Sequence, residues 1–245
     1  MRILRLTNSS DTHSGVVAEL RAPAVTERVV GLATGEHTET MIRAIWPTAD
    51  LPGRVDRWIE AFQPDIVFVR ATSFWCTYES VPLRLEHRLG RVGKPLAGAG
   101  LRLGDRPWLI DRRAFKLARL AVLRTIGGDP HFTPRQVSSV LGEVLRRAIS
   151  RESTIAVVRG PAQFHNSAGT RAGFRRAQTR LRELDALTAE TCRRLHIRYI
   201  SAAGTNDGPS FRLGDDLHDT EAAHRIMGEL EGGVIAEEWL AARQR

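Results

Sequence analysis

Short segments of strand character alternate with longer segments of helical character along this chain, and this alternation limits the possible folds more than any other feature. The strand-like segments are Arg2–Thr7, Val29–Leu32, Asp65–Val69, Thr154–Val158 and Ile197–Ile200. Strands that alternate with helices form parallel sheets covered on both faces, joined by right-handed crossovers. We therefore predict an α/β protein with a three-layer α/β/α fold and a five-stranded parallel sheet.

The predicted helices have apolar residues at helical spacing on one face. They are Thr40–Ile45, Val55–Phe62, Gln136–Ile149, Phe174–Leu195 and Thr220–Leu230. No linker rich in Pro, Gly or Ser and no block of charge interrupts the 245 residues. The sequence therefore predicts a single domain, 1–245.

The formal net charge of +8 raises the question of nucleic-acid or membrane partners. Almost all the cations are arginines, and they are spread over the predicted helices among glutamates, as on solvated helix faces. No zinc-ligand set, RNA-binding aromatic motif or glycine-rich clamp accompanies them, so we expect no specific nucleic-acid partner. The basic segment Asp111–Ile126 is amphipathic, and we favour a packed surface helix over peripheral membrane contact, which stays open as the alternative.

The two cysteines, Cys76 and Cys192, stand far apart and predict neither a disulfide nor a metal site. No apolar run approaches the roughly 20 residues of a membrane-spanning helix. Met1 leads directly into a predicted strand, without the pattern of a signal peptide. We therefore expect a cytoplasmic protein.

An acid and a histidine three residues apart, Asp215 and His218, stand in a polar loop before the last predicted helix. In a Ser-His-Asp arrangement the carboxylate orients the histidine, which takes a proton from a serine. The polar run 8–12 after the first strand offers Ser9 and Ser10, and parallel strands would bring both loops to one edge of the sheet. The alternative is that these are ordinary turn and capping residues.

The order of these segments and the block Asp215–Met227 resemble the SGNH/GDSL hydrolase family, over most of the chain apart from an insertion at about 89–132. The resemblance implies a flavodoxin-like sheet, a nucleophilic serine after the first strand and an Asp-x-x-His pair before the last helix. It implies hydrolysis or transfer of an acyl group from a small-molecule ester, with no metal and no organic cofactor.

The family's first block, Gly-Asp-Ser, falls on Thr7-Asn8-Ser9 or on Asn8-Ser9-Ser10. We favour Ser10 as the nucleophile, because Ser10-Asp11-Thr12 keeps the Ser-x-Thr pattern that follows it in the family. Ser9 stays open as the alternative.

Acyl transfer also needs hydrogen-bond donors for the developing oxyanion. The resemblance implies the amide of Ser10 and that of Gly35, which matches the glycine of the second block. The asparagine of the third block is missing after the third strand, so Thr72 or Ser73 would take its place. A literal Gly-Thr-Asn-Asp occurs at Gly204–Asp207, but it follows the fifth strand, and we interpret it as a turn.

Phe74 and Trp75 are the predicted walls of a substrate pocket, and His165 and Asn166 follow the fourth strand, where they would reach the substrate. The first hypothesis is therefore an esterase of the SGNH/GDSL type. The second is a protein of the same fold with weak or lost catalysis that serves as a binding or accessory module. Neither the acyl substrate nor the oligomeric state is indicated by the sequence.

Overall fold

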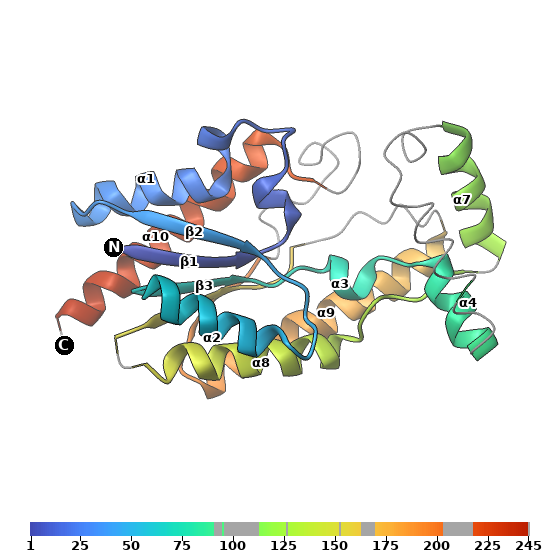
Figure 1. Ribbon diagram of the computed structural model, residues 1–245. Helices are drawn as coiled ribbons and strands as arrows, with labels where there is room; N and C mark the ends of the chain where they lie inside the picture. Colours follow the sequence, from blue (N-terminus) through green and yellow to red (C-terminus); the bar gives the residue numbers. More distant parts are fainter. Residues whose placement is uncertain are drawn as a thin grey trace.

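The computed structural model of the protein describes residues 1–90, 95, 113–125, 127–151, 153–162, 170–202 and 218–244. Five parallel strands form one sheet at its centre (Figure 1). They are β1 (Arg2–Thr7), β2 (Glu39–Ala44), β3 (Ile66–Arg70), β4 (Ile155–Arg159) and β5 (Arg198–Ile200). The strand order β2-β1-β3-β4-β5 is that of flavodoxin-like folds, and it confirms the predicted sheet.

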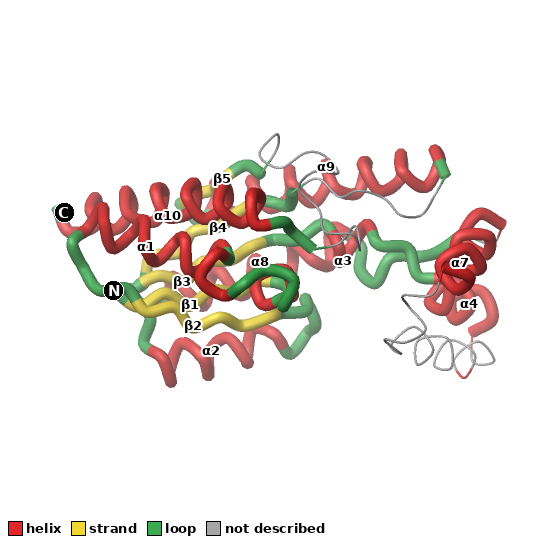
Figure 2. Tube along the Cα trace, turned by 90° about the horizontal axis from the view of Figure 1, so that it is seen from above, coloured by secondary structure: helices red, strands yellow, loops and turns green. Residues whose placement is uncertain are grey.

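Helices cover both faces of the sheet and make the outer layers (Figure 2). On one face, α2 (Leu51–Phe62), α8 (Pro134–Ile149) and α9 (Arg171–Arg194) pack on Leu4, Leu6, Val67 and Val69. On the other, α1 (Ala22–Thr34) and α10 (Glu221–Arg243) pack on Ile3, Ile66 and Phe68. Alternate residues of β1 and β3 thus enter two cores, which is the pattern of a strand buried on both sides.

Two predicted elements between β1 and α2 are wrong. The predicted strand Val29–Leu32 lies inside α1, and the predicted helix Thr40–Ile45 is strand β2. The buried residues of α1, among them Val25 and Val30, share one helical face, whereas Leu32 is 81% exposed. β2 is an edge strand without a clean buried alternation, and its pairing with β1 from Glu39 to Ala44 fixes its conformation.

Three further helices precede α8 in the described part of the region between β3 and β4. They are α3 (Phe74–Thr77), α4 (Val81–Leu89) and α7 (Arg113–Thr125). α4 and α7 lie together at the end of the molecule away from both termini (Figures 1 and 2). Leu117 of α7 is exposed, whereas Leu123 is buried, as expected for a surface helix packed on one side. Among the helices of the described ranges, none has the length and apolar character needed to span a membrane.

α10 crosses α1 at close range because two glycines of α10 face the side chains of α1. A Cβ atom on Gly228 would lie 2.5 Å from the Cβ of Val25, and one on Gly232 would lie 2.7 Å from the Cβ of Val29. The neighbouring Gly233 has nothing within 4 Å of such an atom. The two helices therefore need glycine at 228 and 232, but not at 233.

We expect Gly232→Ala to be less stable than Gly233→Ala by about 2 kcal/mol, the usual cost of overpacking a tight contact. Both substitutions gain the same helix propensity, so the difference isolates the clash with Val29. Urea denaturation of the two variants and the wild type gives this difference directly. Equal stabilities would contradict the packing described for α1 and α10.

Candidate active site

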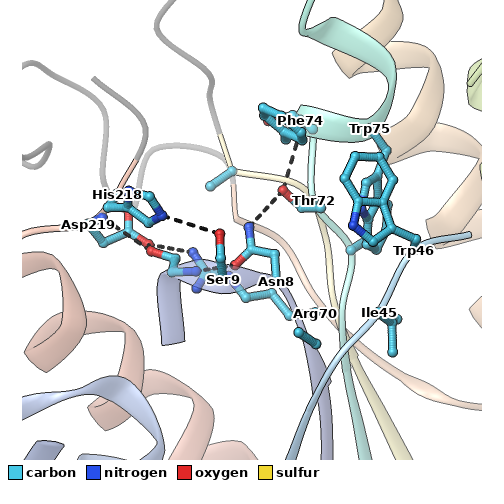
Figure 3. Close-up of a pocket in the computed structure, with 15 residues that line it drawn as sticks. Asn8, Ser9, Ile45, Trp46, Arg70, Thr72, Phe74, Trp75, His218 and Asp219 are labelled. Atoms are coloured by element: carbon cyan, nitrogen blue, oxygen red, sulfur yellow. Dashed lines mark hydrogen bonds and ion pairs between the residues drawn. The ribbon is translucent and has the colours of Figure 1, made fainter. Parts of the chain in front are cut away.

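A pocket of about 200 Å³ opens at the carboxyl ends of β1, β2 and β3 (Figure 3), the edge of such a sheet where ligands bind. The residues that line it come from the segments that leave these strands, from the end of β4 and from the start of α10. They are Asn8, Ser9, Ser10, Ala44, Ile45, Trp46, Arg70, Ala71, Thr72, Ser73, Phe74, Trp75, Ala162, His218 and Asp219.

Ser9 and His218 face each other across one side of this pocket, as Figure 3 shows. Ser9 is the first residue of a short 3-10 helix, η1 (Ser9–Thr12), which begins directly after β1 with Asn8 as its N-cap. The Ser9 Oγ lies 3.2 Å from His218 Nε2, although the two residues are 209 positions apart in the chain. The ring of His13 stacks on that of His218, with the centroids 3.7 Å apart and the planes at 17°. An exposed hydroxyl within hydrogen-bond reach of an imidazole is the pairing that activates a serine nucleophile.

Ser10 occupies a different environment from Ser9. It is 3% exposed, and its Oγ donates to Asp219 Oδ2 at 2.7 Å. Ser10 Oγ also accepts a hydrogen bond from the Asp219 backbone N–H at 3.2 Å. Successive residues of a 3-10 helix point about 120° apart, so only one of two adjacent serines can face His218. The structure brings Ser9 to His218, whereas the sequence pattern favours Ser10.

Several predicted site residues lie outside the described part of the chain. These are Asp215, His165 and Asn166, and the predicted turn Gly204–Asp207 also lies there. The role of Asp215 as the acid that orients His218 therefore stays a prediction, as do the substrate contacts of His165 and Asn166.

Gly35 is not at the site, because the strand expected before it is a helix. It ends α1 in the left-handed conformation, with φ 72°, and it precedes β2. The start of β2 pairs with the start of β1, where Glu39 N donates to Met1 O, so Gly35 lies at the opposite edge of the sheet from Ser9. The loop that does follow β2 begins Ile45-Trp46-Pro47 and carries no glycine.

Asn8 forms hydrogen bonds with two of the predicted oxyanion residues, Ser10 and Thr72. Its Oδ1 accepts the amide of Ser10 at 3.1 Å, so this amide is engaged and does not point freely to a substrate. Its Nδ2 donates to Thr72 Oγ1 at 3.1 Å (Figure 3). Thr72 and Ser73 both line the pocket. Asn8 is absent from the predicted site residues, although it stands at the second position of the Thr7-Asn8-Ser9 frame.

Phe74 and Trp75 line the pocket, in the position expected for walls. Trp46, from the segment after β2, forms another wall that was not predicted, because this segment is interpreted from sequence as the end of a helix. Its ring meets Phe74 and His131 edge to face, with centroids 6.0 Å and 5.3 Å away, and it stays 42% exposed.

Beneath the pocket three arginines meet three acids in the interior. Arg70 contacts Asp219 at 2.7 Å and Asp11 at 2.9 Å, and Arg5 contacts Asp11 at 2.7 Å. Arg5 and Arg159 then hold Glu231 of α10 at 2.7 Å and 3.0 Å. Burial alone would raise the pKa of Asp11, but the Arg5 and Arg70 guanidiniums hold it well below its usual range. Asp11 is therefore charged, and the buried cluster pairs three arginines with three acids.

The described residues contain no group of three or more His, Cys, Asp or Glu side chains placed to hold a metal ion. The arrangement at the pocket is that of an exposed hydroxyl, an imidazole and nearby amide donors. It can carry out proton transfer and nucleophilic attack with side chains alone.

No protein-family model and no curated protein matches this chain. Solved structures do match over nearly its whole length. The esterase EstA from Pseudoalteromonas sp. has 10% identity and a TM-score of 0.57, with 98% of both chains covered. The aryl esterase from M. smegmatis has 12% identity and a TM-score of 0.56, again with 98% of each chain. A G-D-S-L family protein from Desulfitobacterium hafniense has 12% identity and a TM-score of 0.53, with 95% of this chain and 98% of that one covered. A likeness at such identities is one of fold, and the chain therefore has the fold of the SGNH/GDSL hydrolases.

Proposed function

We propose that the protein is a serine hydrolase of the SGNH/GDSL type that cleaves or transfers the acyl group of an ester. The observation that carries this proposal is the Ser9 Oγ to His218 Nε2 distance of 3.2 Å at the edge of an open pocket. The esterases of the same fold support the reaction class. Ser9 is the nucleophile in this proposal, and His218 is the general base.

In the first half of the reaction Ser9 Oγ attacks the acyl carbon, and its proton passes to His218 Nε2. His218 then gives this proton to the leaving alkoxide, which departs as an alcohol and leaves the acyl group on Ser9. A water molecule, deprotonated by His218, attacks the acyl-serine, and the carboxylic acid leaves as Ser9 regains its proton. Asp215 orients the imidazole in this proposal, and the stacked His13 ring restrains its tilt.

The oxyanion formed in each half needs donors at the start of η1. The candidate donors are the backbone amide of Ser9 and the Nδ2 group of Asn8, since both residues line the pocket, and Asn8 Nδ2 carries a second hydrogen besides the one given to Thr72. The hydroxyls of Thr72 and Ser73 are further candidates at the same wall. Asn8 thus takes the place that an asparagine after β3 has in the family.

The pocket favours a short acyl group. Its volume of about 200 Å³ lies below the roughly 300–1,000 Å³ of sites for drug-sized ligands. Its walls beyond Ser9 are Trp46, Phe74, Trp75 and small residues such as Ala71, so the acyl chain meets an apolar surface. Est24 from Sinorhizobium meliloti, another protein of this fold, is a carbohydrate acetylesterase, which fits an acyl group of this size.

A second candidate is a binding or accessory protein of this fold with little turnover. The loops after β2 and β3 carry neither the glycine nor the asparagine that serve as oxyanion donors in the family. Loss of one such donor costs about 100-fold to 1,000-fold in rate. The Ser9 hydroxyl is exposed at the pocket and lies within hydrogen-bond distance of His218, which favours the enzyme over this candidate.

The proposal is tested by hydrolysis of p-nitrophenyl acetate, butyrate and palmitate by the wild-type protein. We expect turnover of acetate and butyrate, much slower turnover of palmitate, and inhibition by a fluorophosphonate. A folded protein that hydrolyses none of these esters and does not react with the fluorophosphonate would contradict the proposal. Binding of a short ester without turnover would favour the second candidate.

A further inference from the structure

We propose that Ser10, Asp219 and Arg70, here called the positioning cluster, hold Ser9 and His218 at their working distance. This inference rests on the proposed function, because it assigns a role toward the Ser9–His218 pair. None of the three side chains is proposed to touch the reacting atoms. Each acts through its neighbours in the chain.

The first link is a two-way hydrogen bond between the segments that carry the nucleophile and the base. Ser10 Oγ donates to Asp219 Oδ2 at 2.7 Å and accepts the Asp219 amide at 3.2 Å. Ser10 is next to Ser9, and Asp219 is next to His218. The bond therefore fixes the two loops one residue away from the place where the two reactive groups meet.

The second link ties this bond to the sheet. Arg70, the last residue of β3, donates to the same Asp219 Oδ2 at 2.7 Å and to Asp11 Oδ1 at 2.9 Å. Asp11 belongs to η1, the helix that Ser9 begins. One guanidinium thus holds the nucleophile segment and the histidine segment together.

The third link is the buried network of ion pairs that surrounds the positioning cluster. The side chains of Arg70, Asp11 and Asp219 are 6%, 0% and 0% exposed. Arg5 continues the network from Asp11 to Glu231 in α10. A displaced partner in such a place leaves a charge unpaired in a medium of low dielectric constant, so the network resists movement.

The geometry gives the cluster a kinetic role. A misplacement of about 1 Å between reacting groups can cost about 100-fold in rate. Loss of the Ser10–Asp219 bond would let the loops separate, while the pocket walls Trp46 and Phe74 would stay in place. The cluster should therefore govern kcat rather than KM.

The test compares Ser10→Val with Ser10→Thr, two side chains of nearly equal shape that differ by the hydroxyl. We expect kcat for p-nitrophenyl butyrate to fall roughly 10-fold to 100-fold in Ser10→Val, with KM nearly unchanged, and to recover in Ser10→Thr. Ser10→Ala replaces this pair if the larger side chains do not fold. Gly232→Ala serves as the control for stability, since it disturbs the contact of α10 with Val29 of α1, lies outside the pocket lining and should leave kcat unchanged.

Wild-type kcat in a folded Ser10→Val or Ser10→Ala protein would overturn the inference, as would an equal loss of kcat in Gly232→Ala. The NMR signal of the His218 ring gives a second readout, and we expect its chemical shift to change in Ser10→Val and to return in Ser10→Thr. Failure of the proposed function is seen separately, as full activity in Ser9→Ala. A loss in Ser9→Ala with no effect at Ser10 would leave the nucleophile in place and remove only the positioning cluster.

Discussion

Replacing Ser9 by alanine should lower kcat/KM for p-nitrophenyl butyrate by about 10⁴-fold or more, the scale seen when a serine nucleophile is removed. The acyl-serine intermediate cannot form without the Ser9 hydroxyl, and His218 then has only water to activate. The fold should be unaffected, because the Ser9 side chain is exposed and its hydroxyl contacts His218 Nε2 at the surface of the pocket. Steady-state kinetics and thermal denaturation of the same preparation measure both effects.

Ser14→Ala is the matched control for this substitution. Ser14 is also an exposed serine of the segment after β1, but it does not line the pocket. We expect wild-type kcat/KM in Ser14→Ala. Activity within about tenfold of wild type in Ser9→Ala would exclude Ser9 as the nucleophile.

The protein should lose about 3 kcal/mol of stability between pH 7 and pH 4 through the single side chain of His224. His224 is 1% exposed, and its Nδ1 accepts the amide of Ala22 at 3.2 Å, so the neutral ring fits its place between α10 and α1. Burial lowers the pKa of His224 to about 4, and the carboxylates of Asp11 and Glu231 offset only part of this effect. Between pH 6.5 and 4 the unfolded chain takes up a proton that the folded chain does not, so stability falls as the pH falls.

His224→Asn isolates this effect, because the asparagine oxygen can accept the Ala22 amide but has no proton to gain. Urea denaturation at a series of pH values should show a shallower loss of stability in the variant. Burial also lowers the pKa of His131, and the low pKa of Asp11 makes stability fall only below about pH 4. Both residues are present in the wild type and in His224→Asn, so their effects on the pH dependence of stability are the same in the two proteins. The same dependence on pH in His224→Asn and wild type would contradict this account.

The elements that can be predicted from sequence are those whose side chains are buried, because their apolar pattern is visible in a short segment. β3 and β4 are continuous apolar runs buried on both faces, and their segments are recognised from sequence within one residue at each end. β2 is an edge strand held by its pairing with β1, and a sequence window does not contain that partner. The incorrect prediction at β2 has two consequences. Gly35 is predicted as an oxyanion donor, and Trp46, which follows β2, is left out of the predicted pocket.

The choice between Ser9 and Ser10 depends on contacts that are remote in sequence. Asp219 and Arg70 draw Ser10 into the interior, and Ser9 is thereby turned to the pocket. A signal for this network does exist in the sequence. Arg5, Arg70 and Arg159 stand next to apolar residues in or at the end of strands, and a buried arginine requires a buried acid nearby. The acid that pairs with each arginine is determined only when α10 packs against the sheet.

The most direct test of the central claim, that Ser9 is the nucleophile paired with His218, is to locate the adduct left by a fluorophosphonate. Trypsin releases residues 6–21 as one peptide, which contains Ser9, Ser10 and Ser14, and fragmentation by mass spectrometry distinguishes the three serines. We expect the phosphonyl group on Ser9, an adduct that persists in Ser10→Thr and disappears in Ser9→Ala. An adduct on Ser10, or no adduct on the folded wild-type protein, would contradict the claim.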